Sequence, residues 1–242
     1  MVSDTVWKLP AIVDRYLSFR TAIPMVTEQI GVMMSILKSR QYPVESFLDL
    51  GCGDGILAAA ILGTYPASRG MLVDFSLPML EQAREQLQDY RNQLTFLDLD
   101  YGNPAWVSAV QAGGLFDAIV SGLSIHHQPD TRKQAIYQEI YSLLKPGGWF
   151  INIEHIAAAS QLVTDLFNNH VIDGYYAIEK RNGGTRTREE MADVFMKRPD
   201  KDANKLLSVN VQCSWLCEIG YTEVDCYFRI YELAVFAGRR PT

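Results

Sequence analysis

The stretch Phe47–Gly55 reads FLDLGCGDG and combines an apolar run with three glycines and two acids. Asp49 lies inside the apolar run, and Gly51, Gly53 and Gly55 follow it at alternate positions. This pattern predicts a strand that ends in a tight turn, because glycine lets the backbone bend sharply and lets a ligand approach without a Cβ atom in the way. Ligands of open sheets with parallel strands bind beyond the carboxyl ends of the strands. We therefore expect a ligand site at this turn.

Strand-like and helix-like segments alternate after this turn. Short apolar runs predict strands, and apolar residues at helical spacing predict helices. Such alternation is typical of a parallel sheet with helices on both faces and right-handed crossovers. The end of the chain, YTEVDCYFRIYELAVFAG, contains two apolar runs with almost no loop and predicts a final antiparallel pair of strands. The other predicted strands are 46–50, 70–74, 94–99, 116–121 and 147–154, and the predicted helices are 25–40, 55–65, 76–93, 104–111, 130–144, 160–172, 186–196 and 206–219.

The chain has 242 residues and a composition, 48% hydrophobic and 21% charged, that favours one globular domain with a large core. We divide it into N-terminal helices (1–42), a ligand-binding core (43–157), a helical lid or insertion (158–206) and a last helix with a strand pair (207–242).

The net charge is −6, and no dense basic stripe is visible. This argues against non-specific binding of nucleic acid.

The N-terminus lacks the basic start and apolar core of a signal peptide, and no apolar run reaches about 18 residues, so we expect no membrane span. Cys52, Cys213, Cys217 and Cys226 form no Cys-x-x-Cys pair and match no zinc spacing. We expect four reduced cysteines, a cytoplasmic protein and no metal site.

Two kinds of ligand use a turn of this type. A dinucleotide needs a small residue three positions after the second glycine, but Ile56 stands there. Asp49 would also repel a pyrophosphate, whereas it suits a ligand with an ammonium group. Asp74 ends the second predicted strand, at the distance where an acid binds a ribose diol. A ribose joined to a cationic amino acid describes S-adenosylmethionine.

The ordered segments FLDLGCGDG, LVDFS, FLDLDY, FDAIVSGLSIHH and LLKPGGWFINIE, between about residues 45 and 155, resemble the motif series of class I S-adenosylmethionine-dependent methyltransferases. The resemblance implies an α/β, Rossmann-like sheet of seven strands, mostly parallel, with the last strand antiparallel. It implies that Asp74 binds the ribose, that Phe75 lies against the adenine, and that Asp100 or its alternative Asp98 binds the adenine amine. The predicted cofactor-binding residues are Asp49, Gly51, Cys52, Gly53, Asp74, Phe75, Ser76, Met79, Asp100, Tyr101, Ser121 and Gly122.

Two pairs of side chains are candidates for catalysis. His126 and His127 follow the fourth predicted strand, and Glu154 and His155 end the fifth. The resemblance puts the acceptor cleft between them. A histidine takes up a proton near neutral pH and contributes about 10²–10⁴ in rate as a general base. The structural alternative is that these residues cap a helix, pack or hydrogen-bond within the fold.

The segments SVNVQCSWLCEIGYTEVDCYFRIYELAVFAGRR and RTAIPMV also resemble the carboxy-S-adenosylmethionine synthases of tRNA wobble-uridine modification. In those enzymes an arginine ahead of the same helix binds the extra carboxylate, and Arg198 is the nearest match. The turn GCGDG and the segment KRPDKDAN differ from the synthase pattern, so we expect unmodified S-adenosylmethionine as the donor. The predicted substrate-binding residues are Tyr16, Arg20, His126 and Arg198.

These observations predict a cytoplasmic enzyme that transfers a methyl group from S-adenosylmethionine to a small-molecule acceptor. We also expect Tyr16, Phe167, Tyr175, Tyr176 and Tyr231 to line its pocket. The alternatives are a synthase that modifies the cofactor itself, a nicotinamide enzyme, and a protein that binds the cofactor without turnover. The sequence predicts no membrane partner and leaves a role in a tRNA pathway, the acceptor and the oligomeric state open.

Overall fold

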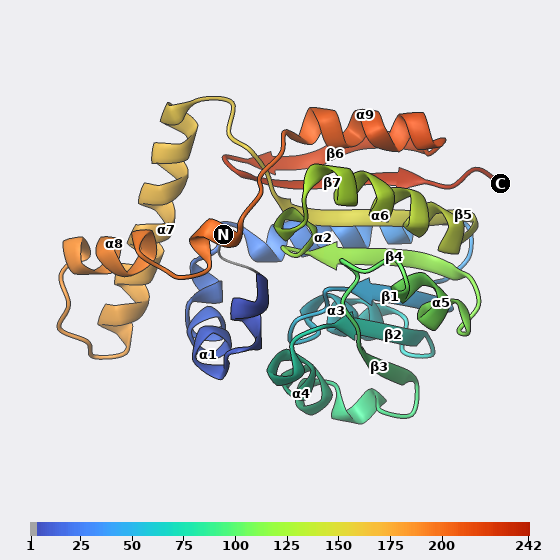
Figure 1. Ribbon diagram of the computed structural model, residues 1–242. Coiled ribbons are helices and arrows are strands. Elements are labelled where there is room, and N and C mark those ends of the chain that lie inside the picture. Colours follow the sequence, from blue (N-terminus) through green and yellow to red (C-terminus); the bar gives the residue numbers. More distant parts are fainter. Residues whose placement is uncertain (1–3) are drawn as a thin grey trace.

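Seven strands form one sheet in the computed structural model, which describes residues 4–242 (Figure 1). The strand order is β3-β2-β1-β4-β5-β7-β6, and β7 runs antiparallel to both of its neighbours. This confirms the predicted fold class. Residues 1–3 of the predicted N-terminal helical region lie outside the described part. The strands are β1 (Ser46–Leu50), β2 (Arg69–Asp74), β3 (Leu94–Asp98), β4 (Phe116–Gly122), β5 (Leu144–His155), β6 (Thr222–Ile230) and β7 (Leu233–Arg239).

One face of the sheet is covered by α2 (Val26–Lys38), α3 (Ile56–Thr64) and α4 (Leu77–Gln86). In α3 the buried residues Leu57, Ala58, Ile61 and Leu62 recur at helical spacing. Burial of each leucine or isoleucine side chain contributes about 1.5–3 kcal/mol. This packing fixes α3 directly after the glycine turn, against the carboxyl ends of the central strands.

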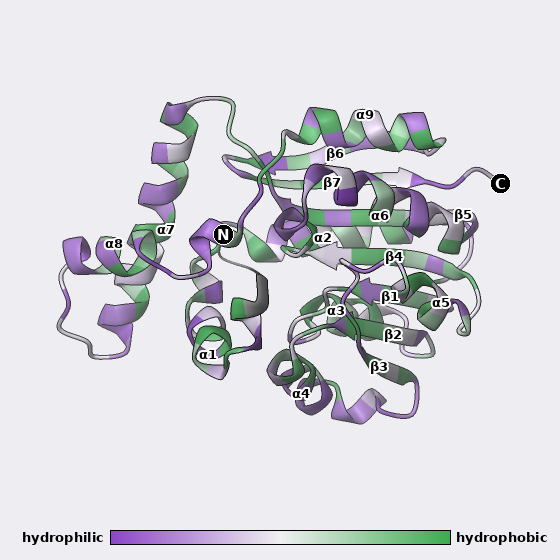
Figure 2. Ribbon diagram, viewed as in Figure 1, coloured by the Kyte–Doolittle hydropathy of each residue, from purple (hydrophilic) through white to green (hydrophobic). Residues whose placement is uncertain are grey.

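The other face is covered by α5 (Trp106–Gln111), α6 (Asp130–Leu143) and α9 (Val209–Ile219). Helix α9 begins where the Ser208 side chain accepts a hydrogen bond from the Asn210 backbone, and it ends at Gly220, which has a φ of 110°. Figure 2 shows hydrophobic and hydrophilic residues alternating around α9, as expected for a helix with one buried side.

Two further parts of the chain lie at the carboxyl ends of the strands. The N-terminal part consists of η1 (Asp4–Lys8), α1 (Pro10–Phe19) and η2 (Arg20–Ala22), and α1 contacts both α4 and α7. The lid consists of α7 (Gln161–Arg181), α8 (Arg188–Met196) and η5 (Lys201–Ala203). Helices α7 and α8 project away from the sheet, and α1 lies between them and α4 (Figure 1).

Several elements differ in length from the sequence-based prediction. Helix α7 runs to Arg181 rather than 172, because Gly174 does not end it but packs closely against Ala22. Helix α4 ends at Gln86 and is followed by the short η3 (Gln88–Tyr90). Strand β5 begins at Leu144, three residues before the predicted start, because Leu144 pairs with Phe116 ahead of a shift in register.

No helix within residues 4–242 combines the length and the apolar character that crossing a bilayer requires.

Candidate functional site

The glycine turn between β1 and α3 holds three residues in the left-handed region, with φ values of 70° at Gly51, 53° at Gly53 and 82° at Gly55. The backbone N–H groups of Gly51 and Cys52 donate to Val73 O at 2.8 and 3.0 Å. The turn is therefore fixed to the end of β2. At Gly51 an added Cβ would collide with the side chain of Ser124, so this position requires glycine for space as well as for backbone angle.

The need for glycine at position 51 predicts a loss of stability when it is replaced, and Gly53 provides the matched control. A Gly51→Ala substitution adds the collision with Ser124 to the backbone strain, whereas Gly53→Ala adds strain alone because its Cβ would meet nothing within 4 Å. A left-handed non-glycine residue costs about 1–2 kcal/mol. We expect Gly53→Ala to lose about that much in the free energy of unfolding in urea, and Gly51→Ala to lose more. Equal losses would contradict the close approach of Ser124.

Two buried carboxylates stand beside this turn. Asp49 accepts a hydrogen bond from the Ala58 backbone at 3.2 Å, and its Oδ1 atom has no hydrogen-bond partner among the described residues. Burial raises the pKa of Asp49 to about 7. Asp74 accepts backbone hydrogen bonds from Gly53 and Ser76, both at 2.9 Å. Burial outweighs these bonds and raises the pKa of Asp74 to about 6. Both carboxylates would be stabilised by a ligand that brings positive charge or hydrogen-bond donors.

Two adjoining cavities open at the turn, with volumes of about 170 Å³ and about 460 Å³. Asp74 lies in the wall of the first, Asp49 lies in the wall of the second, and Gly51 and Gly53 border both. A space of this size suits a small-molecule ligand. The cofactor-binding residues of the sequence-based prediction that line one or both cavities are Asp49, Gly51, Cys52, Gly53, Asp74, Phe75, Ser76, Met79 and Gly122.

The N-terminal segment covers the cavities from outside. Ser76 Oγ donates to Trp7 O at 2.6 Å, and Lys8 Nζ lies 5.7 Å from the centroid of the Phe75 ring. Arg20 forms an ion pair with Asp54 on the glycine turn. Contacts at both ends of the cavities therefore hold this segment across them.

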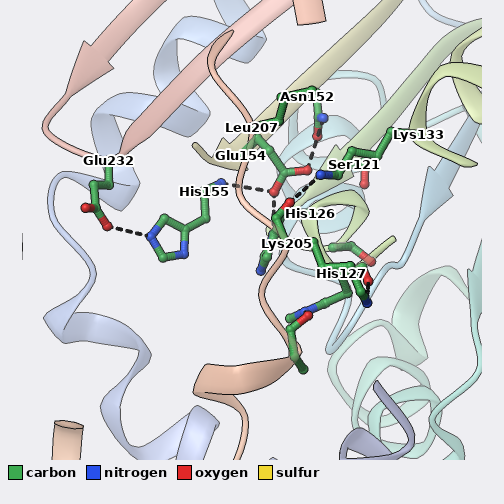
Figure 3. Close-up of polar contacts among 12 residues, drawn as sticks. Ser121, His126, His127, Lys133, Asn152, Glu154, His155, Lys205, Leu207 and Glu232 are labelled. Atoms are coloured by element: carbon green, nitrogen blue, oxygen red, sulfur yellow. Dashed lines mark hydrogen bonds and ion pairs between the residues drawn. The ribbon is translucent and has the colours of Figure 1, made fainter. Parts of the chain in front are cut away.

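A histidine–carboxylate pair joins the ends of β4 and β5 (Figure 3). His126 Nδ1 lies 2.5 Å from Glu154 Oε1, and Glu154 also accepts from Asn152 Nδ2 at 3.2 Å. Burial raises the pKa of Glu154 to about 7 and lowers the pKa of His126 well below its usual range. The two groups are in direct contact, so they titrate as a coupled pair. The His126 ring lies in the wall of the first cavity.

Lysine contacts fix the backbone of the segment that carries His126 (Figure 3). The Lys205 backbone N–H donates to His126 O at 2.9 Å, and Lys205 Nζ donates to His127 O at 2.5 Å. The fully buried Lys133 donates in turn to Lys205 O and to Asp130 Oδ1. These bonds tie the segment to the chain between η5 and α9.

The other predicted histidines lie against the same cavity. His155 Nε2 lies 3.0 Å from Glu232 Oε2, and Thr164 Oγ1 donates to Glu232 Oε1 at 2.6 Å. The His127 ring packs on His126, with centroids 4.0 Å apart. All four predicted catalytic residues therefore meet at one place, and the three imidazole rings border the first cavity.

The lid and α1 each place one arginine at the first cavity. Arg198 contacts Asp200 at 3.1 Å and stacks over the Phe195 ring, and Arg15 of α1 forms an ion pair with the same Asp200. Two arginines thus share one carboxylate and leave a net positive charge at the cavity wall. Of the aromatic residues expected there, Tyr16, Phe167 and Tyr175 line the first cavity, whereas Tyr176 and Tyr231 line neither.

Three predicted cofactor-binding residues line neither cavity. Tyr101 is buried, and its Oη lies 2.5 Å from Ser124 Oγ, behind the glycine turn. Ser121 is fully buried and donates to Leu50 O at 2.7 Å. Asp100 accepts from the Gly102 backbone in a local turn at 2.7 Å. Their roles toward a cofactor stay predictions.

Several cavity residues were missed by sequence analysis: Trp7, Arg15, Phe195, Asp200 and Asn204. They come from the N-terminal segment and the lid, and no local motif marks them. Among residues 4–242, no group of three or more His, Cys, Asp or Glu side chains is placed to hold a metal ion.

Comparison with known proteins agrees with this geometry. Residues 47–148, which carry the glycine turn and β1 to β4, match the family model described as a methyltransferase domain. The carboxy-S-adenosyl-L-methionine synthase of Chromohalobacter salexigens is 25% identical over 227 residues, 89% of this chain and 76% of that protein.

Solved structures share the fold. An O-methyltransferase family protein from Burkholderia thailandensis has a TM-score of 0.65 at 16% identity, over 96% of this chain. PigF with SAH has a TM-score of 0.59 at 16% identity, over 98% of this chain. This chain spans 59% and 61% of the length of those two proteins.

Residues 47–148 therefore match a methyltransferase domain, and the chain shares its fold with class I methyltransferases. The domain match and the fold support S-adenosylmethionine as the cofactor. The site fits S-adenosylmethionine. Among the described residues the buried Oδ1 atom of Asp49 has no hydrogen-bond partner, and the glycine turn borders the cavity with its backbone accessible.

Proposed function

We propose that this protein is an S-adenosylmethionine-dependent methyltransferase that methylates a small-molecule acceptor, with the His126–Glu154 pair as proton acceptor. The observation that carries the proposal is that His126 borders the same cavity as Asp74 and the glycine turn. A methyl donor and a base would thereby meet in one cavity.

Different residues at the two cavities would bind different parts of the cofactor. Asp49 and the glycine turn would hold the cationic methionine part, and Asp74 would accept the ribose hydroxyls. Phe75 and Met79 border the first cavity beside Asp74 and offer an apolar surface for the adenine. When bound, S-adenosylmethionine supplies a methyl group activated by its sulfonium.

The His126–Glu154 pair would remove a proton from the acceptor. Glu154 holds Nδ1 of His126, and the acceptor would take the place of the Asn204 side chain, which also hydrogen-bonds to His126, so that Nε2 accepts the proton. The N-terminal segment and the lid border the cavity and would hold the acceptor in line. Such alignment contributes about 7–11 kcal/mol to lowering a barrier.

The cavity walls support a small acceptor rather than a macromolecule. Trp7 and Tyr16 of the N-terminal segment and Phe167 of α7 line the first cavity. Arg15 and Arg198 add positive charge that suits an acceptor with an acidic group. The four free cysteines support the reducing cytoplasm as the compartment.

The test is methyl transfer from ¹³C-methyl-S-adenosylmethionine into a metabolite extract. We expect S-adenosylhomocysteine to form and one or more small molecules to gain the labelled methyl group, as measured by mass spectrometry. Binding of the cofactor without any S-adenosylhomocysteine would contradict the proposal and favour a binding protein without turnover.

The raised pKa of Asp49 predicts a pH dependence of cofactor binding. Below its pKa of about 7 the carboxyl is protonated, and a cationic ligand must displace that proton. We expect the affinity for S-adenosylmethionine to rise with pH between 6 and 7, by up to about tenfold per unit, and to level off above. Calorimetry in buffers of different ionisation enthalpy should show proton release near pH 6.5.

Asp49→Asn provides the control for this titration. It keeps the shape of the side chain but removes its charge, so we expect weaker binding with less pH dependence. 5′-Methylthioadenosine, which lacks the amino-acid part, should show only the weaker dependence due to Asp74, whose pKa is about 6. A wild-type affinity that is flat with pH would contradict the assignment of Asp49 to the cationic part.

A second candidate function is the synthesis of carboxy-S-adenosylmethionine. It is favoured by the similarity over 89% of this chain to the Chromohalobacter synthase and by Arg198 at the cavity wall. Arg198 is however paired with Asp200. Incubation with S-adenosylmethionine and prephenate decides between the two functions, because only a synthase yields a cofactor with the mass of an added carboxylate.

A further inference from the structure

Arg20 borders both cavities and has no part in the methyl transfer proposed above. It belongs to η2, at the end of the N-terminal segment, and its guanidinium forms an ion pair with the buried Asp54 on the glycine turn. Among the described side chains the guanidinium has no other ion pair and no hydrogen bond. Because a guanidinium has several N–H donors, most of them stay available to a bound molecule.

The second cavity is acidic apart from Arg20. Asp49, Asp54 and Glu28 border it, and Arg20 is the single Lys, Arg or His side chain among its described lining residues. An anionic group in this cavity is therefore attracted by Arg20 alone, while the acids around it repel the group.

The backbone of the glycine turn offers little to an anion. Free N–H groups of such a turn commonly form an anion-binding hollow. Here most of them already donate within the protein, with the end of β2 or the turn itself as acceptor. The N–H groups engaged in this way are those of Gly51, Cys52, Gly53 and Gly55. The positive charge for an anion has to come from a side chain instead.

The methionine part of the cofactor brings an anion to this cavity. S-adenosylmethionine carries an ammonium and a carboxylate on the same carbon atom, so both groups lie in one cavity. Asp49 suits the ammonium, because one of its buried oxygens has no partner among the described residues. We propose that the guanidinium of Arg20 binds the carboxylate of the methionine part.

Asp54 acts through Arg20 and is a positioning residue, because its ion pair holds the guanidinium against the glycine turn. The inference rests on the proposed cofactor and deepens the description of its site. It assigns Arg20 to the methyl donor, whereas the sequence-based prediction assigned it to the acceptor.

The groups around Arg20 leave its charge available to a second carboxylate. Burial raises the pKa of Tyr16, although the nearby Arg20 opposes this, so the phenol is neutral and does not compete for the guanidinium. Asp54 is the one anion paired with Arg20 among the described residues. A planar guanidinium can bind two carboxylates, because its N–H donors point along different edges.

Binding of the carboxylate would also anchor the N-terminal segment. Tyr16 of α1 and Arg20 of η2 border both cavities. A ligand that binds Arg20 therefore holds η2 against the glycine turn, whereas a ligand without the carboxylate lacks this contact.

The experiment compares two ligands that differ by the carboxylate alone. Decarboxylated S-adenosylmethionine keeps the adenosine, the sulfonium and the ammonium, and calorimetry with the full chain gives the Kd of each ligand. The variants are Arg20→Gln, Arg20→Lys, Asp54→Asn and, as control, Arg69→Gln. Arg69 stands at the exposed start of β2 and lines neither cavity.

We expect the wild type and Arg69→Gln to bind S-adenosylmethionine about 10–10²-fold more tightly than the decarboxylated ligand, as for a hydrogen-bonded pair of charged groups. Arg20→Gln should lose or reverse this preference, through weaker binding of S-adenosylmethionine alone. Arg20→Lys should keep part of the preference, because the charge remains without the planar fork. Asp54→Asn should reduce it less than Arg20→Gln, since the guanidinium is still present.

Equal losses for the two ligands in Arg20→Gln would overturn the inference, because Arg20 would then only hold the N-terminal segment in place. A wild type that binds both ligands equally would overturn it as well. Both results leave the proposed methyl transfer standing, which the metabolite-extract assay tests separately. If the wild type binds neither ligand, this inference and the cofactor assignment are both wrong.

A second readout needs no variant. Amide hydrogen exchange of the wild type is followed in residues 10–22, which cover α1 and η2, with either ligand at saturation. We expect slower exchange there with S-adenosylmethionine than with the decarboxylated ligand, and equal protection of α3 by both. Equal protection of residues 10–22 by the two ligands would overturn the contact between Arg20 and the carboxylate.

Discussion

Replacement of His126 by glutamine is expected to lower kcat for methyl transfer by about 10²–10⁴-fold while the Kd for S-adenosylmethionine stays within about twofold. The physical reason is that a ring nitrogen of His126 lies 2.5 Å from Glu154, a buried carboxylate of raised pKa, at the wall of the first cavity. Single-turnover rates and calorimetric titration with the cofactor separate the two quantities.

The control for this prediction is Glu154→Gln, which keeps the side-chain shape but removes the negative charge behind the ring. We expect a smaller loss of kcat and a change in the pH profile, because the imidazole becomes a weaker base. Since removal of one partner from a buried pair also lowers stability, thermal unfolding should be measured for both variants. A folded His126→Gln protein with wild-type kcat would contradict the role of His126 as the base.

Replacement of Asp74 by alanine is expected to raise the Kd for S-adenosylmethionine and for S-adenosylhomocysteine by about 10²-fold or more. A hydrogen bond to a charged acceptor is worth about 1.5–3 kcal/mol, and the ribose offers two hydroxyls. Asp74 also holds Gly53 and Ser76 in place at 2.9 Å, so the turn loosens when the carboxylate is removed. Calorimetry with the two ligands measures the effect.

Asp98 at the end of β3 supplies the comparison for Asp74. The two residues are paired in register across β2 and β3, but Asp98 lines neither cavity. We expect Asp98→Ala to change the Kd by less than about threefold. An Asp74→Ala protein that binds the cofactor as tightly as the wild type would show that the ribose lies elsewhere.

The succession of strands and helices along the core and the glycine turn were predictable from the sequence, because both depend on short-range patterns. Each parallel strand is a short apolar run, and the turn after β1 is marked by the three glycines between Gly51 and Gly55, all of which have positive φ. Asp49 and Asp74 were found for the same reason, since both lie at strand ends that the pattern locates.

The pairing of His126 with Glu154 was not predictable from either residue alone. The two are 28 residues apart and meet because β4 and β5 are parallel neighbours, with Gly122 beside Ile153. The sequence indicated both as candidates, but the distance between them depends on a short η4 (Ile125–His127) that turns His126 back toward β5. Lid and N-terminal residues such as Trp7 and Asn204 were missed because long-range packing alone brings them to the cavity.

The contacts of the Tyr101 side chain could not be predicted from the sequence. Its hydroxyl meets Ser124 behind the turn, in the space left by the missing side chain of Gly51. Arg132 holds the Tyr101 carbonyl with Nη2 at 2.7 Å and so fixes the backbone there. Such a local network cannot be read from residue type and spacing.

A crystal structure with S-adenosylhomocysteine tests the central claim most directly. We expect the ribose at the carboxylate of Asp74, the amino-acid part beside Asp49 and the glycine turn, and the sulfur facing the His126 ring across the first cavity. A ligand seated away from both aspartates, or with its sulfur turned away from His126, would contradict it.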